Sequence, residues 1–218
     1  MRARDLLIYK LIYKMMSYPR KCYYKKYQKR LKNKSPSLIT SDCLGGIIYH
    51  NLGLKFMSPT INLYIEPKEF VTFVHNLKGF MESDVIEIKA ENKKFPVGQI
   101  EYNGKKVTLN FMHYNSFEEA KNKWDERKLR IDYSNIYIAQ IIVDATKEDF
   151  EAFESLPYEN KILITKENLT NSKNVTTLKI FSKKKYKPGE GFHYKNWFSI
   201  KRHIDEWDYV EFLNKSNK

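Results

Sequence analysis

The residues of this chain with the clearest chemical potential are a thiol, Cys43, and an imidazole, His113. A cysteine activated by a neighbouring histidine is a nucleophile of acyltransferases and hydrolases, because the imidazole takes the thiol proton. The alternative for Cys43 is a small buried residue that packs beneath a turn. His113 could instead hydrogen-bond a neighbouring loop as a structural residue. Together with Tyr114, which follows it, His113 could also bind sugar hydroxyls or act as an acid/base pair.

The stretch around Cys43 predicts a short strand, a tight turn and the first turn of a helix that ends near Gly53. The first backbone amides of a helix have no partner within it, and the helix dipole is positive there, so an anion or a thiolate is favoured. No complete phosphate-loop or dinucleotide-binding motif surrounds the glycines of this turn. The turn therefore supplies candidate ligand-binding residues: Ser41, Asp42, Gly45 and Gly46.

Two arginines could hold a diphosphate group. Arg127 and Arg130 are three positions apart and share one face of a predicted helix. Guanidinium groups bind phosphate oxygens in a bidentate manner, so the pair could hold a nucleotide-sugar or a lipid-linked donor. The alternative is a salt-bridged or solvated end of the helix. The chain contains no Asp-x-Asp motif and no metal-ligand spacing of Cys or His, so we expect neither a metal nor a cofactor.

Strands alternate with helices from residue 38 to residue 165, which predicts a three-layer α/β/α domain. The sheet should be mostly parallel, with an antiparallel section where Asn103-Gly104 gives a hairpin signal. Ser116 with Glu119 three positions later predicts a helix N-terminus. We also expect strands over residues 61–65 and 177–181, and short helices near residues 197–204 and 206–213 in a tail whose aromatic residues would be buried.

The positive charge of the chain is concentrated at its start. Residues 1–34 contain twelve Lys and Arg against the single acid Asp5, a net charge of +11 out of +13 for the whole chain. Apolar and aromatic residues alternate with these lysines, which predicts an arm on an anionic membrane surface, a helix packed on the body or, less favoured, a nucleic-acid arm. We divide the chain into an arm and linker, residues 1–36, and a single α/β domain with a helical tail, residues 37–218.

The two cysteines, Cys22 and Cys43, fit no disulfide framework, which favours a reducing, cytoplasmic setting. No apolar run approaches the ~18 residues needed to cross a bilayer. We expect a cytoplasmic protein, with association at the inner face of the cell membrane through the arm.

Several motifs together resemble a known bacterial family. The motifs are Ser41-Asp42-Cys43-Leu44-Gly45-Gly46-Ile47-Ile48-Tyr49, Ser58-Pro59-Thr60-Ile61-Asn62-Leu63-Tyr64-Ile65, Phe95-Pro96-Val97-Gly98, His113-Tyr114 and Trp124-Asp125-Glu126-Arg127. They are similar to the domain of unknown function nineteen-nineteen, whose members are often called exopolysaccharide biosynthesis proteins, over roughly residues 37 to 215. The resemblance implies an α/β fold and a role in surface-polysaccharide assembly, and it adds Ser58 to the candidate ligand-binding residues. Asp42 stands where relatives usually have Asn.

These observations favour a transferase of exopolysaccharide or capsule biosynthesis that acts on an activated sugar or a lipid-linked glycan. Cys43 and His113 are its candidate catalytic residues, and the turn, Tyr114 and the two arginines are its candidate ligand-binding residues. One alternative is a noncatalytic partner that docks other enzymes of the polysaccharide machinery. Another is an acyltransferase or hydrolase that uses the Cys/His pair. The sequence does not predict an oligomeric state.

Overall fold

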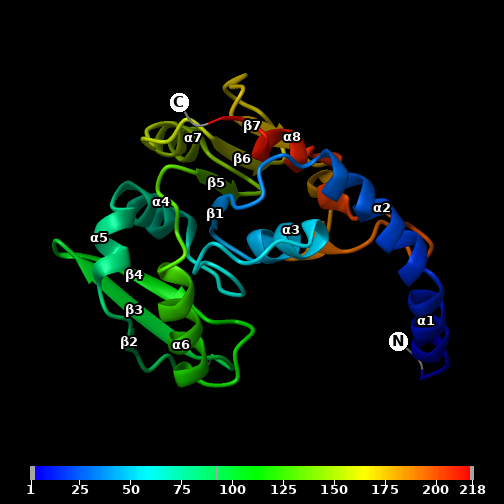
Figure 1. Cartoon of the computed structure of the whole chain (residues 1–218), viewed down its shortest axis with the longest axis horizontal. Helices are drawn as coiled ribbons and strands as arrows, with labels where there is room; N and C mark the ends of the chain where they lie inside the picture. The colour runs from blue at the N-terminus through cyan, green and yellow to red at the C-terminus, as the bar shows by residue number, and fades with distance from the viewer. Residues whose placement is uncertain (1–2, 92, 217–218) are drawn as a thin grey trace.

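Two β-sheets form the centre of the computed structural model, which describes residues 3–91 and 93–216 (Figure 1). The first sheet is parallel, and its strand order is β1 (Ser37–Thr40), β5 (Ile136–Ile141), β6 (Lys161–Thr165) and β7 (Val175–Thr177). The second is antiparallel and contains β2 (Ile86–Glu87), β3 (Val97–Tyr102) and β4 (Lys105–Asn110). The α/β prediction with a mostly parallel sheet and an antiparallel section at Asn103-Gly104 is confirmed. The antiparallel strands form a sheet of their own.

The parallel sheet is covered on both faces because neighbouring residues of a strand point to opposite sides. Leu38 packs with the cluster that contains helices α3 (Leu44–Leu52) and α8 (Tyr209–Leu213). Ile39 packs with the opposite cluster, which contains helices α4 (Pro67–His75) and α7 (Lys147–Glu154). This second cluster continues into the antiparallel sheet with its helices α5 (Leu77–Glu82) and α6 (Phe117–Lys128). The two sheets therefore share one hydrophobic core.

Three predicted elements are absent, or have another form, within the part of the chain that the structure describes. Residues 61–65 form no strand, since Asn62 has a left-handed backbone with φ of 63° and only Tyr64 bridges to Asn110. The strand expected over residues 177–181 ends at Thr177 as β7, and a 3-10 helix, η1 (Lys179–Ser182), takes up the rest of that range. In the tail, a bridge between Tyr194 and Arg202 closes a loop where a helix was expected, and 3-10 helices η2 (Glu190–Phe192) and η3 (His203–Glu206) flank it.

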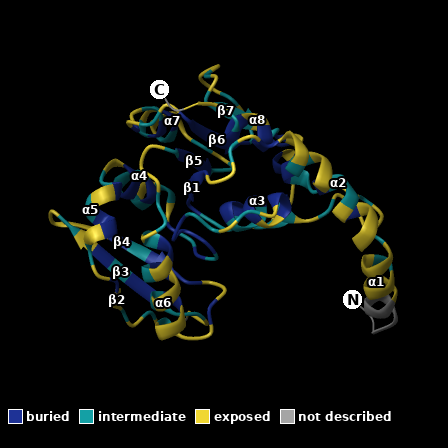
Figure 2. Ribbon diagram, viewed as in Figure 1, coloured by how far each residue is buried: buried dark blue, intermediate teal, exposed yellow. Residues whose placement is uncertain are grey.

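The basic arm forms two helices, α1 (Ala3–Met15) and α2 (Ser17–Arg30), which project from the body (Figure 1). Figure 2 shows that α1 is largely exposed, whereas the strands β1, β5 and β6 of the parallel sheet are buried. Arg20 and Tyr24 of α2 are buried against the C-terminal segment. The first two residues of the arm and the last two of the tail lie outside the described residues. None of the helices within the described ranges is long and apolar enough to cross a membrane.

Candidate functional site

A cavity of about 930 Å³ opens where the carboxyl ends of β1 and β5 meet α3 and the C-terminal segment. Ligands of α/β proteins collect at this edge of a parallel sheet, and the volume lies within the ~300–1,000 Å³ of small-molecule sites. Much of the wall is apolar and includes Ile47, Phe56, Pro67, Met112, Ile141, Ile142, Val143, Pro188 and Phe192. Four of the predicted site residues also line it: Asp42, Cys43, Gly46 and His113.

Cys43 and His113 meet at this cavity, where Sγ and Nε2 lie 3.1 Å apart. An extended segment brings them together. The Ile65 amide donates to the Ser41 carbonyl over 2.8 Å, and Tyr64 pairs through both backbone groups with Asn110 at the end of β4. The turn after β1 and the residues after β4 are therefore held side by side. The pair has the geometry of a thiol and its base.

Burial governs the electrostatics of the pair. Desolvation, reinforced by the negative charge of Asp42, raises the pKa of the Cys43 thiol to about 12. The sequence predicted the opposite direction, because it placed the sulfur at a helix N-terminus. Desolvation also raises the pKa of the Asp42 carboxyl to about 6, although a hydrogen bond from the Leu44 amide partly opposes this shift. At neutral pH the sulfur is therefore a thiol, and it becomes a nucleophile only if His113 takes its proton.

The turn offers less to an anion than its sequence predicted. Side chains already occupy two of the first amides of α3: Asp42 Oδ1 accepts from the Leu44 amide over 2.9 Å, and Thr40 Oγ1 accepts from the Gly45 amide over 3.3 Å. Gly45 is buried against Thr40, and a Cβ atom there would lie 2.9 Å from Thr40 Oγ1. The Ser41 side chain is buried, and its carbonyl accepts from Ile65. Of the two glycines, only Gly46 lines the cavity.

Four further predicted site residues do not line the cavity. Arg127 is 8% exposed, and its Nη1 donates to Tyr114 Oη over 2.7 Å, while Tyr114 Oη donates to the Ile61 carbonyl. Arg130 donates to the Phe56 carbonyl over 3.1 Å and pairs with Glu126. Ser58 is fully buried. These side chains hold loops in place, because their polar atoms are directed at protein partners.

Seven polar residues of the cavity wall were not among the predicted site residues: His50, Asn51, Asn62, Tyr64, Tyr186, His193 and Arg202. The first lies on α3, where only its position one turn after Gly46 indicates the cavity. The last three belong to the C-terminal segment, where the sequence predicted a buried aromatic tail over residues 192–200 that includes only His193 of the three. No local pattern marks them, because the chain folds back over the sheet edge from a distance of more than 140 residues.

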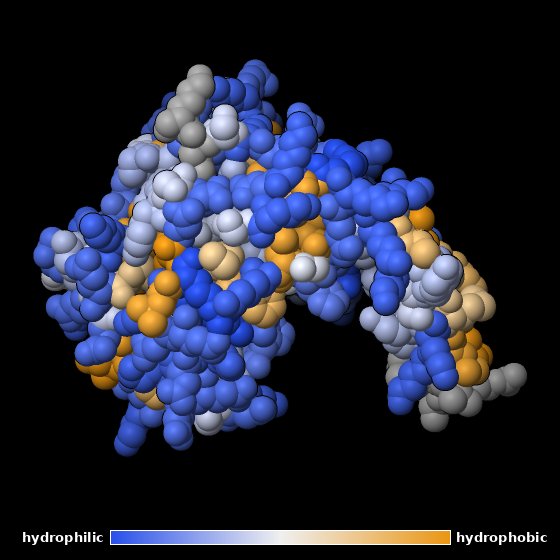
Figure 3. All heavy atoms as spheres, viewed as in Figure 1, coloured by the Kyte–Doolittle hydropathy of each residue, from blue (hydrophilic) through white to orange (hydrophobic). Residues whose placement is uncertain are grey.

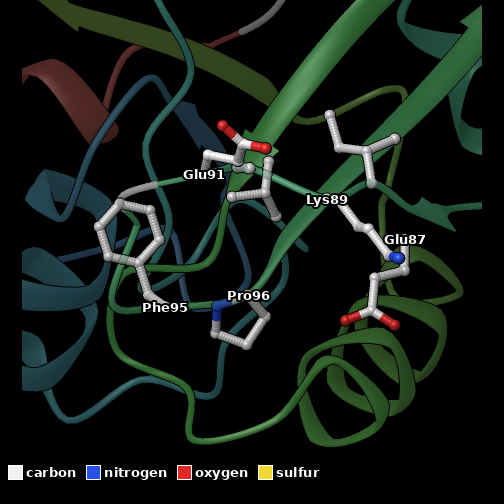
Figure 4. A pocket seen from close by; sticks show the side chains of 8 residues that line it. Glu87, Lys89, Glu91, Phe95 and Pro96 are labelled. Carbon is white, nitrogen blue, oxygen red and sulfur yellow. The ribbon is translucent and has the colours of Figure 1, made fainter.

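A second hollow of about 310 Å³ lies beside β2 and β3 (Figure 4). Phe95 and Glu91 stand on one side of it and Lys89 and Glu87 on the other. The connection between β2 and β3 forms this hollow together with the strand residues that flank it. None of the predicted site residues lines it. Within residues 3–91 and 93–216, no cluster of three His, Cys, Asp or Glu could hold a metal ion. The larger cavity is therefore the candidate functional site.

Comparison with known proteins places the chain beside a protein family and a bacterial relative. The family described as "Domain of unknown function (DUF1919)" matches residues 14–214. An uncharacterized protein of Haemophilus influenzae is 31% identical over 188 residues, which cover 86% of this chain and 88% of that protein. The family match includes Cys43 and His113, and it begins inside the arm.

Proposed function

The chain belongs to the family of the domain of unknown function DUF1919, and from this premise we propose that it is a transferase of exopolysaccharide or capsule biosynthesis that uses Cys43 as its nucleophile. The group transferred is an acyl group, and the acceptor is a sugar hydroxyl of a surface glycan or of its lipid-linked precursor. The observation that carries the proposal is the 3.1 Å separation of Cys43 Sγ and His113 Nε2 at the wall of a large cavity. The reaction would take place at the inner face of the cell membrane.

The chemistry proceeds in two balanced steps. His113 takes the proton of Cys43 as the sulfur attacks the carbonyl carbon of the donor. A C–S bond forms, the bond to the leaving group breaks, and the leaving group receives the proton from the imidazolium. In the second step the acceptor hydroxyl gives its proton to His113 and attacks the thioester. The C–S bond breaks, and the sulfur recovers a proton from the imidazolium.

The walls of the cavity favour acyl transfer over transfer from a nucleotide-sugar. An acyl chain is apolar, and so are Ile141, Ile142 and Val143 at the end of β5, which line the cavity together with Phe56 and Met112. A diphosphate requires cations, yet Arg127 and Arg130 are engaged with Tyr114 and the Phe56 loop, and Arg202 of the cavity wall donates to the Phe192 carbonyl. The geometry therefore supports the Cys/His alternative better than a phosphate clamp.

Trapping of the acyl-enzyme tests this proposal. Full-length protein is mixed with p-nitrophenyl esters of short and medium acyl chains without an acceptor, and intact mass spectrometry detects a thioester. We expect one acyl group on Cys43, a burst of nitrophenol, and loss of both in Cys43→Ser and His113→Ala. Cys22→Ser is the matched control and should acylate like the wild type. Absence of a thioester on Cys43 with every ester, or equal labelling of Cys22, would contradict the proposal.

A noncatalytic assembly partner is the second candidate. The observation that favours it is the set of exposed apolar side chains on α1, such as Leu11 and Met15, which are 61% and 59% exposed. Under this alternative the thiol stays unacylated, and Cys43→Ser supports wild-type polysaccharide output in cells. Loss of output in Cys43→Ser with unchanged protein levels excludes it.

A further inference from the structure

The arm and the C-terminal loop that packs against it both expose apolar side chains. On α1, Ile8, Leu11 and Met15 recur with the spacing of one helix face and are 40%, 61% and 59% exposed. Figure 3 shows hydrophobic residues running along the arm on the right of the view. Side chains this large, exposed together, are unusual for a protein surface that faces only water.

A loop from the other end of the chain extends this apolar surface. Trp197, Phe198 and Ile200 are 42%, 60% and 36% exposed, although the sequence predicted burial. The Tyr9 ring of α1 packs edge-on against the Trp197 ring, with centroids 5.9 Å apart. The six side chains Ile8, Leu11, Met15, Trp197, Phe198 and Ile200 are called the apolar face below.

Hydrogen bonds fix the conformation of this loop. The Tyr194–Arg202 bridge closes it, and the Lys195 amide donates to the Lys201 carbonyl over 3.0 Å. Arg20 of α2 fixes it to the arm, because its Nε donates to the Ser199 carbonyl over 3.1 Å and its Nη2 donates to the Trp197 carbonyl over 2.8 Å. The buried Arg20 guanidinium also lies 3.7 Å from the centre of the Tyr194 ring. A buried arginine thus fixes the backbone of a loop whose aromatic side chains are exposed.

The charge around the apolar face identifies its partner. Lys10 and Lys14 lie on the same helix as its aliphatic residues, Lys201 lies at the end of its loop, and the first 34 residues contain one acid. A second copy of the chain would bring the same positive charge and would be repelled. Nucleic acid would use the lysines and the aromatic rings but would leave Ile8, Leu11 and Met15 in water. A surface that is both anionic and apolar just below its charges is a lipid bilayer.

We propose that the apolar face of α1 and the Trp197–Ile200 loop together form the membrane-binding surface of this protein, with anionic phospholipid as the partner. The aliphatic side chains and Phe198 enter the boundary between headgroups and acyl chains. Trp197 lies at headgroup depth, and the lysines contact lipid phosphates. The surface extends the predicted role of the arm to a loop whose part no sequence pattern indicated. It does not depend on the reaction of Cys43.

Vesicle binding by the full-length protein tests the surface. Vesicles of phosphatidylcholine alone and with phosphatidylglycerol are sedimented with the protein at low and high salt. We expect binding to the anionic vesicles that weakens with salt, and binding at least about tenfold weaker for the double variant Leu11→Ser with Phe198→Ser. The matched control is Leu169→Ser, whose leucine is 58% exposed on the connection between β6 and β7. It should bind like the wild type.

A spectroscopic signal locates the contact. The chain has three tryptophans, and Trp124 and Trp207 are buried, so a blue shift of emission with anionic vesicles reports Trp197. Trp197→Phe should lose the shift while the protein still sediments with the vesicles. Circular dichroism melts of all variants must match the wild type.

Two outcomes of the sedimentation experiment would overturn the proposal. One is a wild-type protein that fails to sediment with anionic vesicles, and the other is a double variant that binds them as well as Leu169→Ser does. Self-association or oligonucleotide binding without vesicle binding overturns it in favour of those partners. Because these readouts measure binding, an unreactive thiol leaves them unchanged.

Discussion

Cys43 Sγ lies 3.1 Å from His113 Nε2, although the two residues belong to segments that follow different sheets. The contact exists because residues 64 and 65 hydrogen-bond to both segments. The pair faces an apolar cavity, and the sulfur is held as a thiol by burial and by Asp42. Four consequences of this arrangement and of its surroundings can be measured.

Asp42 should make the stability of the protein depend on pH. Its pKa rises from 3.8 to about 6 on folding, so the folded protein binds this proton more tightly than the unfolded chain. The resulting stabilisation is complete below about pH 4 and is lost as the pH rises through about 6. Asp42→Asn retains an oxygen for the Leu44 amide and removes the charge. We expect it to raise the free energy of unfolding by up to about 3 kcal/mol at pH 8 and to change little at pH 4.

Urea titrations of both proteins at the two pH values measure this difference. The wild type and Asp42→Asn both accept the hydrogen bond of the Leu44 amide. Asp42→Ala removes that hydrogen bond as well as the charge and serves as the control. If Asp42→Asn is less stable than the wild type at pH 8, another group must stabilise the Asp42 carboxylate, which would contradict the structure.

The Cys43 thiol should alkylate slowly at neutral pH. With a pKa of about 12, only a very small fraction of the sulfur is thiolate at pH 7.5, so reaction with iodoacetamide should be at least about tenfold slower than that of free cysteine. The rate should still be rising at pH 10. Asp42→Asn should accelerate it, because the Asp42 charge is the second cause of the shift. Mass spectrometry of a Cys22→Ser background gives the rate at Cys43 alone. A fast reaction that levels off near pH 7 would indicate a resting thiolate instead.

The two glycines of the turn should respond differently to alanine. A Cβ atom at position 45 would lie 2.9 Å from Thr40 Oγ1, so Gly45→Ala must displace that side chain, which also accepts the Gly45 amide. We expect Gly45→Ala to lower the free energy of unfolding by about 1–3 kcal/mol. At position 46 the nearest atoms would be 3.4 Å away, an ordinary contact. Gly46→Ala should be neutral or should gain up to about 1 kcal/mol from helix propensity. Thermal melts compare the two, and equal effects would argue against close packing at Gly45.

Arg127 should contribute to stability rather than to phosphate binding. Arg127→Ala removes a charge-assisted hydrogen bond to the buried Tyr114 hydroxyl and the contact of its guanidinium with the Phe56 ring, 5.0 Å away. We expect the free energy of unfolding to fall by about 2–4 kcal/mol. Arg130→Ala, on the more exposed neighbour, should cost about 1 kcal/mol. Urea unfolding measures both. If Arg127→Ala unfolds like the wild type but fails to bind a nucleotide-sugar in calorimetry, the phosphate-clamp interpretation returns.

The secondary structure that followed local rules was predictable. Ser116 accepts from the Glu119 amide as its spacing indicated, and the Asn103-Gly104 turn has φ values of 49° and 72° as that dipeptide favours. The failures came where tertiary contacts outweighed a pattern. Residues 61–65 alternate like a strand, yet Asn62 turns the backbone and the segment connects two sheets. The division at residue 36 and the roles of the site residues stay predictions.

By itself, the sequence determined the α/β class, the basic arm and the choice of Cys43 and His113 as reactive candidates, because periodicity, charge and residue chemistry are local properties. Only the tertiary structure decided which candidates share a cavity. It moved Arg127, Arg130 and Ser58 into structural contacts, and it exposed Trp197 beside the arm. The physical reason is that burial and long-range hydrogen bonds set the direction and the pKa of a side chain. The thiol shows this most directly, since desolvation and the charge of Asp42 raise its pKa although it stands at a helix terminus.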